Sequence, residues 1–95
     1  MIRAEIISNQ SVQEDIIEAL EREINGIEYT VIPEIFGRGK RTKKLGDTIW
    51  PEMNFLLFTY VEDSDAIQIK NLVEKMKERF PNEGISVFFV RAESL

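Results

Sequence analysis

Residues 54–61 read Asn-Phe-Leu-Leu-Phe-Thr-Tyr-Val, a run of aromatic and aliphatic side chains with the length and composition of a β-strand. Successive side chains of a strand point to opposite faces of its sheet. Because residues 55–58 are all apolar, both faces of this strand need cover. Residues 87–90, Val-Phe-Phe-Val, repeat the pattern near the end of the chain. We therefore expect a sheet that is covered on both sides.

The segments before this strand alternate between strand and helix patterns. Strands are predicted over residues 2–8 and 27–36. Ser11 followed three residues later by Glu14 is a capping box that predicts a helix start, and Asn25-Gly26 predicts its end, since glycine can adopt the left-handed cap conformation. Apolar residues at three- and four-residue spacing form the expected buried stripe of this helix: Val12, Ile16, Ala19, Leu20 and Ile24.

A second helix is predicted after the central strand. Acidic side chains at Glu62, Asp63 and Asp65 favour a helix start, because negative charge is stabilised near a helix N-terminus. Residues 81–84, Pro-Asn-Glu-Gly, predict its end, and a last strand follows over residues 85–90. The inner stripe of this helix is expected to contain Ile69, Leu72, Val73, Met76 and Phe80.

The order strand-helix-strand-strand-helix-strand predicts an α+β fold, the ferredoxin-like βαββαβ sandwich, as one domain over residues 1–95. Both helices of that fold cover one sheet face and leave the other open. The apolar residues expected on the open face favour oligomerisation through it. The alternative is that the helices or a loop fold over that face.

An extended, basic loop connects the second and third predicted strands. It contains Gly37, Gly39 and Gly46, and it ends at Trp50-Pro51. The chain has a net charge of -5, so these cations form a local patch of opposite sign that suits an anionic ligand or an acidic partner surface. A solvated loop whose charges only maintain solubility is the alternative. The basic residues concerned are Arg38, Lys40, Arg41, Lys43 and Lys44.

The residue inventory excludes several classes of site. The chain has no cysteine and no histidine, which excludes thiol nucleophiles, serine-histidine triads, zinc sites and haem ligation through these residues. No apolar run is long enough for a membrane span, and no leader pattern precedes the first strand, so we expect a cytoplasmic protein. The acidic balance argues against a nucleic-acid binder. The lack of this catalytic inventory predicts that the protein is not an enzyme.

The residues that flank the loop resemble the PII signalling family. The resemblance rests on Phe36-Gly37-Arg38-Gly39-Lys40 at the end of the second strand and on Pro51-Glu52-Met53-Asn54-Phe55 at the start of the third. It implies a homotrimer whose sheets face inward, with a T-loop that docks on a transporter or enzyme. It also implies that the first turn of the loop binds the phosphates of an adenine nucleotide, which acts as effector rather than cofactor.

The resemblance and the charge pattern together define the predicted site residues. Gly37, Arg38, Gly39 and Lys40 are the predicted ligand- and phosphate-binding residues, because glycine lets phosphate approach backbone N–H groups and arginine offers a planar fork. The predicted partner-binding residues are Arg41, Lys43, Lys44 and Trp50, with Trp50 as an aromatic anchor. No catalytic residue and no metal ligand is predicted.

Other family elements differ in this chain. The turn before the last strand, residues 81–84, has one glycine and an acid where the family has a glycine-rich turn with a lysine. No counterpart of the family's arginine-bearing C-terminal loop precedes Leu95, and the loop has no tyrosine that could be uridylylated. We therefore predict that ATP binds weakly or not at all.

Three other functions fit parts of the sequence. An RNA-binding module shares the element order, although residues 54–61 lack the basic-glycine start of its aromatic motif. An acylphosphatase-like hydrolase would need an arginine in a glycine-rich loop after the first strand, where residues 8–11 read Ser-Asn-Gln-Ser. A small-molecule- or metal-binding oligomer without nucleotide sensing could hold a hard cation at Glu62, Asp63 and Asp65, although acids at a helix start are more often capping groups.

Overall fold

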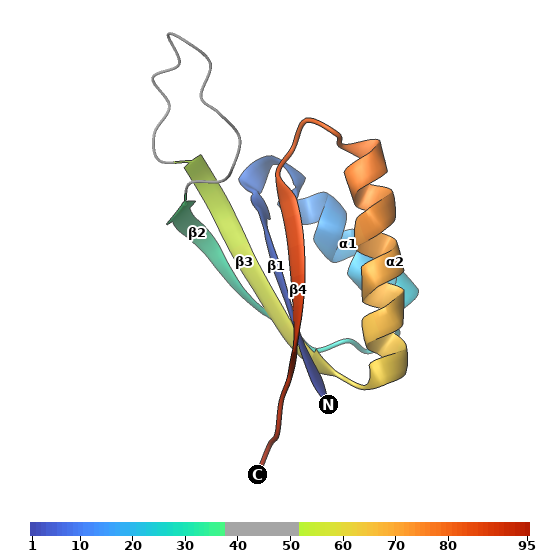
Figure 1. The fold of residues 1–95 in the computed structure, drawn as a ribbon. Helices are drawn as coiled ribbons and strands as arrows, with labels where there is room; N and C mark the ends of the chain where they lie inside the picture. The colour runs from blue at the N-terminus through green and yellow to red at the C-terminus, as the bar shows by residue number, and fades with distance from the viewer. Residues whose placement is uncertain (38–51) are drawn as a thin grey trace, which may run out of the picture.

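The computed structural model describes residues 1–37 and 52–95, and it arranges a sheet and two helices in two layers (Figure 1). This arrangement confirms the predicted ferredoxin-like α+β fold. The described elements, in chain order, are β1 (Ile2–Asn9), the 3-10 helix η1 (Gln10–Val12), α1 (Gln13–Glu23), β2 (Thr30–Gly37), β3 (Glu52–Val61), α2 (Asp63–Arg79) and β4 (Ile85–Arg91).

The strands form one antiparallel sheet in the order β2-β3-β1-β4. β1 lies between β3 and β4, with Ile2 opposite Val61 on one side and opposite Arg91 on the other. Both helices cover the same face of this sheet (Figure 1). The opposite face has no helix over it in the described part of the chain, as the sequence predicts.

The core lies between the sheet and the helices. Phe55 and Leu57 are fully buried there, on alternate positions of β3. The predicted stripe of the first helix is confirmed, since all five residues are buried. Phe80, which follows the last residue of α2, is only partly buried. Ala66, three residues before Ile69, joins the core although it was not among the predicted residues. The buried residues of α2 are Ala66, Ile69, Leu72, Val73 and Met76.

The predicted capping box at Ser11 and Glu14 is wrong. The Asn9 side chain accepts a hydrogen bond from the Ser11 backbone N–H, with N···O of 2.9 Å, and this bond opens η1 rather than α1. α1 then begins at Gln13 without a side-chain cap. Asparagine readily makes such a local bond two residues along the chain, which explains the earlier turn. The predicted glycine cap is confirmed, because Gly26 has φ of 72°.

β2 is shorter and less regular than predicted. It begins at Thr30 rather than at residue 27, because the Ile27 N–H bonds to the Ile24 carbonyl oxygen, at 3.3 Å, in the turn after α1. The pairing with β3 shifts register between Ile32 and Ile35, around Pro33. Proline has no N–H to donate to a neighbouring strand, and such bulges occur mainly at sheet edges. β2 is such an edge.

Two polar side chains are buried on the helix-covered face, and they differ in their partners. The Thr59 hydroxyl donates to the Glu28 carbonyl oxygen, with O···O of 2.5 Å, and ties β3 to the connection before β2. The Ser8 hydroxyl is equally buried but has no hydrogen-bond partner among the described residues. A buried hydroxyl without a partner destabilises the folded state by about 1–3 kcal/mol.

This contrast predicts opposite effects of removing the two hydroxyls. Ser8→Ala should leave the free energy of unfolding unchanged or raise it by up to ~1 kcal/mol, because no bond is lost. Thr59→Val keeps the side-chain shape but removes the bond to Glu28, so it should lower that free energy by about 1–2 kcal/mol. Urea unfolding at one fixed protein concentration measures both. A larger loss for Ser8→Ala than for Thr59→Val would contradict the assignment.

Candidate functional site

The end of the sheet at which β2 stops and β3 starts is the first candidate surface. We call it the loop-bearing end, and define it by Asn9, Gly37, Asn54 and Gly84. Asn9 lies opposite Asn54 across β1 and β3, and its N–H bonds to the Gly84 carbonyl oxygen at 3.3 Å. η1 and the turn between α2 and β4 lie at this same end (Figure 1). Three segments that are far apart in the sequence are therefore adjacent in space.

Gly37 is the one predicted ligand-binding residue that the structure describes. It is the last residue of β2 and lies opposite Glu52. A Cβ at this position would lie 3.3 Å from the Asn54 side-chain nitrogen, closer than an ordinary contact. Glycine at this position therefore has two roles. It leaves room for the Asn54 side-chain amide, and it fits the prediction that a phosphate approaches the backbone N–H groups here. The other predicted site residues, Arg38, Gly39, Lys40, Arg41, Lys43, Lys44 and Trp50, lie outside the described residues.

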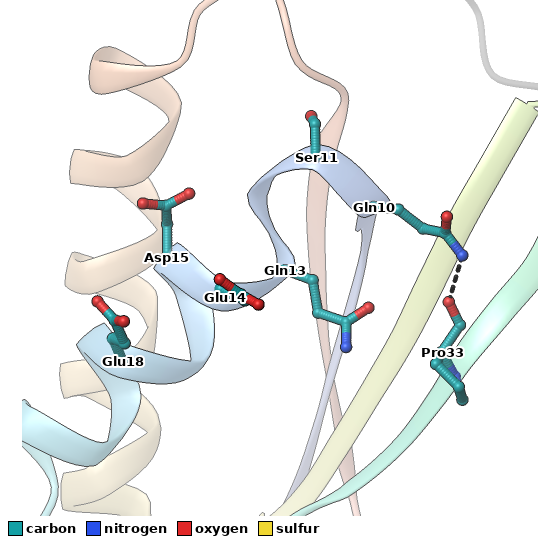
Figure 2. Close-up of a pocket in the computed structure, with 7 residues that line it drawn as sticks. All are labelled: Gln10, Ser11, Gln13, Glu14, Asp15, Glu18 and Pro33. Carbon is teal, nitrogen blue, oxygen red and sulfur yellow. Dashed lines mark hydrogen bonds between the residues drawn. The ribbon is translucent and has the colours of Figure 1, made fainter.

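A polar hollow of about 430 Å³ lies beside the loop-bearing end, between the start of α1 and β2. Figure 2 shows the Gln10 amide, which donates to the Pro33 carbonyl oxygen with N···O of 2.5 Å, and the carboxylates along the first turns of α1. These carboxylates disfavour an anion. The lining residues are Gln10, Ser11, Gln13, Glu14, Asp15, Glu18 and Pro33. An anion bound near this end would need cations from outside the hollow.

The uncovered side of the sheet is the second candidate surface, and we call it the open face. Phe88, Val90 and Tyr60 are its most exposed large side chains, at 55%, 52% and 49%. The register places Phe88 and Phe58 on either side of Glu5, and Val90 and Tyr60 on either side of Arg3. The remaining apolar members are Ile7, Ile32 and Leu56. Together they form an apolar surface across all four strands.

A charged pair occupies the middle of this apolar face. The Arg3 Nε donates to the Glu5 carboxylate with N···O of 2.6 Å, and the Arg3 Nη1 donates to the Tyr60 hydroxyl at 2.7 Å. The guanidinium carbon lies 4.2 Å from the centre of the Phe58 ring, within cation–π distance. The bonds to Glu5 and then to Tyr60 raise the pKa of Arg3, so it stays charged. The sequence does not predict this pair, because only the strand register brings its aromatic partners to it.

Phe88 and Phe89 lie on opposite sides of β4. Phe88 belongs to the open face, whereas Phe89 lines an apolar hollow of about 280 Å³ against α2. Ile67, which is 62% exposed, lines this hollow too. The consecutive apolar residues of the edge strand β4 therefore contribute to both faces of the sheet, one to the open face and the next to the face that the helices cover.

The alternative functions find little support in the described residues. Phe55 is fully buried and cannot stack on a base, while Tyr60 is exposed but bonded to Arg3. Among the residues that the structure describes, no group of acidic side chains could hold a metal ion, and Asp63 instead pairs with Arg91 at 3.6 Å. In residues 1–37 and 52–95, neither helix has the length and apolar character needed to cross a membrane.

Comparison with known proteins supports the PII resemblance at the level of the fold. No family model matches the sequence, and no curated protein matches it. Among solved structures, a PII-like signaling protein from Thermus thermophilus superposes with a TM-score of 0.63 and 20% identity, over 94% of this chain and 83% of that one.

CPII from Thiomonas intermedia K12 also matches. Its structure, bound to ADP and bicarbonate, gives a TM-score of 0.66 and 20% identity over 94% of this chain and 82% of that chain. A second structure of this nitrogen regulatory PII-like protein is bound to ADP, AMP and bicarbonate. It superposes with a TM-score of 0.71 and 15% identity, over 99% of this chain and 94% of that chain. At these identities the likeness confirms the PII-like fold.

The close approach of Gly37 to Asn54 predicts a difference between two glycines at the loop-bearing end. A methyl group added at Gly84 would have no atom within 4 Å, and Gly84 has no positive φ, so Gly84→Ala should raise the free energy of unfolding by about 0.4–1 kcal/mol. Gly37→Ala should give no such gain, because the new Cβ meets Asn54. In an Asn54→Ala background the two substitutions should become equivalent. Urea unfolding measures these free energies. If Gly37→Ala and Gly84→Ala raised the free energy of unfolding equally in the protein that keeps Asn54, the close contact of Gly37 with Asn54 would be contradicted.

Proposed function

We propose that this chain is a divergent PII-like regulatory protein without enzymatic activity, located in the cytoplasm. It assembles as a homotrimer through the open face and binds a small anion or adenine nucleotide at the loop-bearing end. It docks on a protein partner, such as a transporter or enzyme, through its basic loop. One observation carries the proposal: in a chain with the PII-like fold, the sheet face opposite the helices is apolar, and none of the described residues covers it.

The open face supports assembly. Burying one large apolar side chain stabilises a protein by about 1.5–3 kcal/mol, and this face presents several of them around the Arg3–Glu5 pair. Large contiguous apolar patches are rare on proteins that stay monomeric. We take the number of subunits, three, from the PII resemblance, because the sheets of three subunits face inward in proteins of that family.

The ligand proposal rests on the loop-bearing end and on the solved neighbours. CPII is bound to ADP, AMP and bicarbonate, all of them anions. The hollow at this end carries carboxylates, so we assign the positive charge to Arg38 and Lys40, which follow Gly37 in the sequence. The turn at residues 81–84 lies at the same end but contributes no lysine. A ligand with fewer phosphates than ATP fits this reduced set of cations best.

The docking proposal concerns the basic loop. Arg41, Lys43 and Lys44 are the cations that would meet an acidic partner surface, with Trp50 as the anchor. A chain without histidine or cysteine lacks the commonest acid-base group and the thiol nucleophile, which supports a regulatory rather than a catalytic role.

Assembly through the open face predicts that a charge at Phe88 dissociates the protein. Phe88→Asp should give a monomer, because an unpaired charge at a buried interface destabilises the complex by several kcal/mol. Ile67→Asp is the matched control, since it puts the same charge on an exposed apolar position of α2. Light scattering should show three times the 11.1 kDa chain mass for the native protein and the control. A monomeric native protein at micromolar concentration would overturn the assembly proposal.

The ligand proposal predicts measurable binding of ADP, AMP or bicarbonate, and weaker binding of ATP. Isothermal titration calorimetry with each compound tests this. Changing Arg38 and Lys40 together to glutamine should weaken binding at least ~10-fold, since two charge-assisted contacts are removed. Lys70→Gln, on the exposed side of α2, removes a cation elsewhere and should change nothing. If the Arg38 and Lys40 variant still bound the ligand with native affinity, the site would lie elsewhere in the protein. If none of ADP, AMP, bicarbonate and ATP bound the native protein, the anion proposal would be refuted.

A further inference from the structure

The Arg3–Glu5 pair has a place in the sheet that sets it apart from the other ion pairs of the described residues. It lies on β1, an inner strand, with Tyr60 and Val90 beside Arg3 and aromatic rings beside Glu5. The side chains of Arg3 and Glu5 are only 26% and 29% exposed, whereas Arg79 and Arg91 in other pairs are 64% and 73% exposed. A second protein that covered the open face would remove this pair from water.

The pair keeps capacity for further polar partners. The guanidinium has five N–H groups, of which the bonds to Glu5 and Tyr60 engage two. The Glu5 carboxylate receives the Arg3 bond at one of its two oxygens. While the face is open, water can satisfy the remaining groups. When a partner covers it, these groups need protein donors and acceptors, because a buried charge without them destabilises the complex.

The chemistry of the partner follows from this requirement. An apolar surface would leave the remaining N–H and carboxylate groups unsatisfied, and a surface of one charge sign would satisfy one member of the pair and repel the other. A surface that carries one guanidinium and one carboxylate within an apolar surround satisfies both. A second copy of this chain presents that arrangement, since its own open face carries the same two groups.

We propose that Arg3 and Glu5 select the partner at the open face: in the proposed trimer, the Arg3 of each copy meets the Glu5 of one neighbouring copy of this chain, and its Glu5 meets the Arg3 of the other neighbour. The proposal rests on the proposed assembly and adds its specificity: the surrounding apolar residues supply the affinity, and the two charges restrict it to copies of the same chain. Buried polar groups have this role in other assemblies, where they fix register and partner choice at some loss of stability.

Charge reversal in separate chains tests the proposal. Arg3→Glu places two acids on the open face and Glu5→Arg places two cations there, so each variant alone should need a roughly 100-fold higher concentration to assemble. Mixed in equal amounts, the two variants should form complexes that contain both chains, because a 2:1 trimer has two contacts between opposite charges and one between like charges, whereas each variant alone has three between like charges. Native mass spectrometry detects these mixed complexes. Glu78→Arg, on the exposed side of α2, is the control for a charge reversal away from the face. Circular dichroism checks that each variant folds.

A neutral pair tests the selectivity even if the reversed variants do not fold. Arg3→Met with Glu5→Leu keeps similar side-chain volumes, so this protein should assemble with itself. It should not exchange subunits with the native chain, whose charges it cannot satisfy. Free exchange would overturn the proposal, and so would native-like assembly of both single reversals. These results differ from a failure of the proposed assembly, which would appear as a monomeric native protein.

Discussion

The structure depends on an imbalance between its two layers. Four strands carry apolar side chains on both faces, but two helices can cover only one of them. Phe55 and Leu57 are buried beneath the helices, while Leu56 and Phe58, their neighbours in the chain, face the other side. The same strand thus builds the core and an uncovered surface. Every functional proposal for the open face follows from this distribution of residues in β3 and β4.

The fold could be predicted from the sequence because its determinants are local and periodic. The buried stripe of α1 and the glycine at position 26 are visible as spacing and residue type. The errors lie where a single contact decides between near-equal alternatives. The Asn9 side chain opens a 3-10 turn ahead of α1, and the bulge around Pro33 breaks the regularity of β2. Neither contact has a periodic signature.

The candidate site was predicted less completely, for a different physical reason. Gly37 and the basic residues after it are predicted as an anion site from the PII resemblance and the charge pattern, and this assignment stays a prediction. The contact of Gly37 with Asn54 and the bond of Arg3 to Tyr60 cannot, because each joins residues far apart in the chain through strand register. Arg3 and Glu5 look like ordinary solvent-facing charges of an alternating strand until their aromatic neighbours are placed.

The two edges of the sheet differ in a way that bears on how the protein behaves at high concentration. β2 carries a bulge and Pro33, which interrupt the row of N–H donors that another strand would need. β4 has neither a bulge nor a proline, and its residues 85–90 are largely apolar. Continuous growth of a sheet from molecule to molecule requires two competent edges on each molecule. Because the β2 edge is interrupted, a strand added at β4 leaves no second regular edge for further addition, which disfavours the growth of one sheet across many molecules.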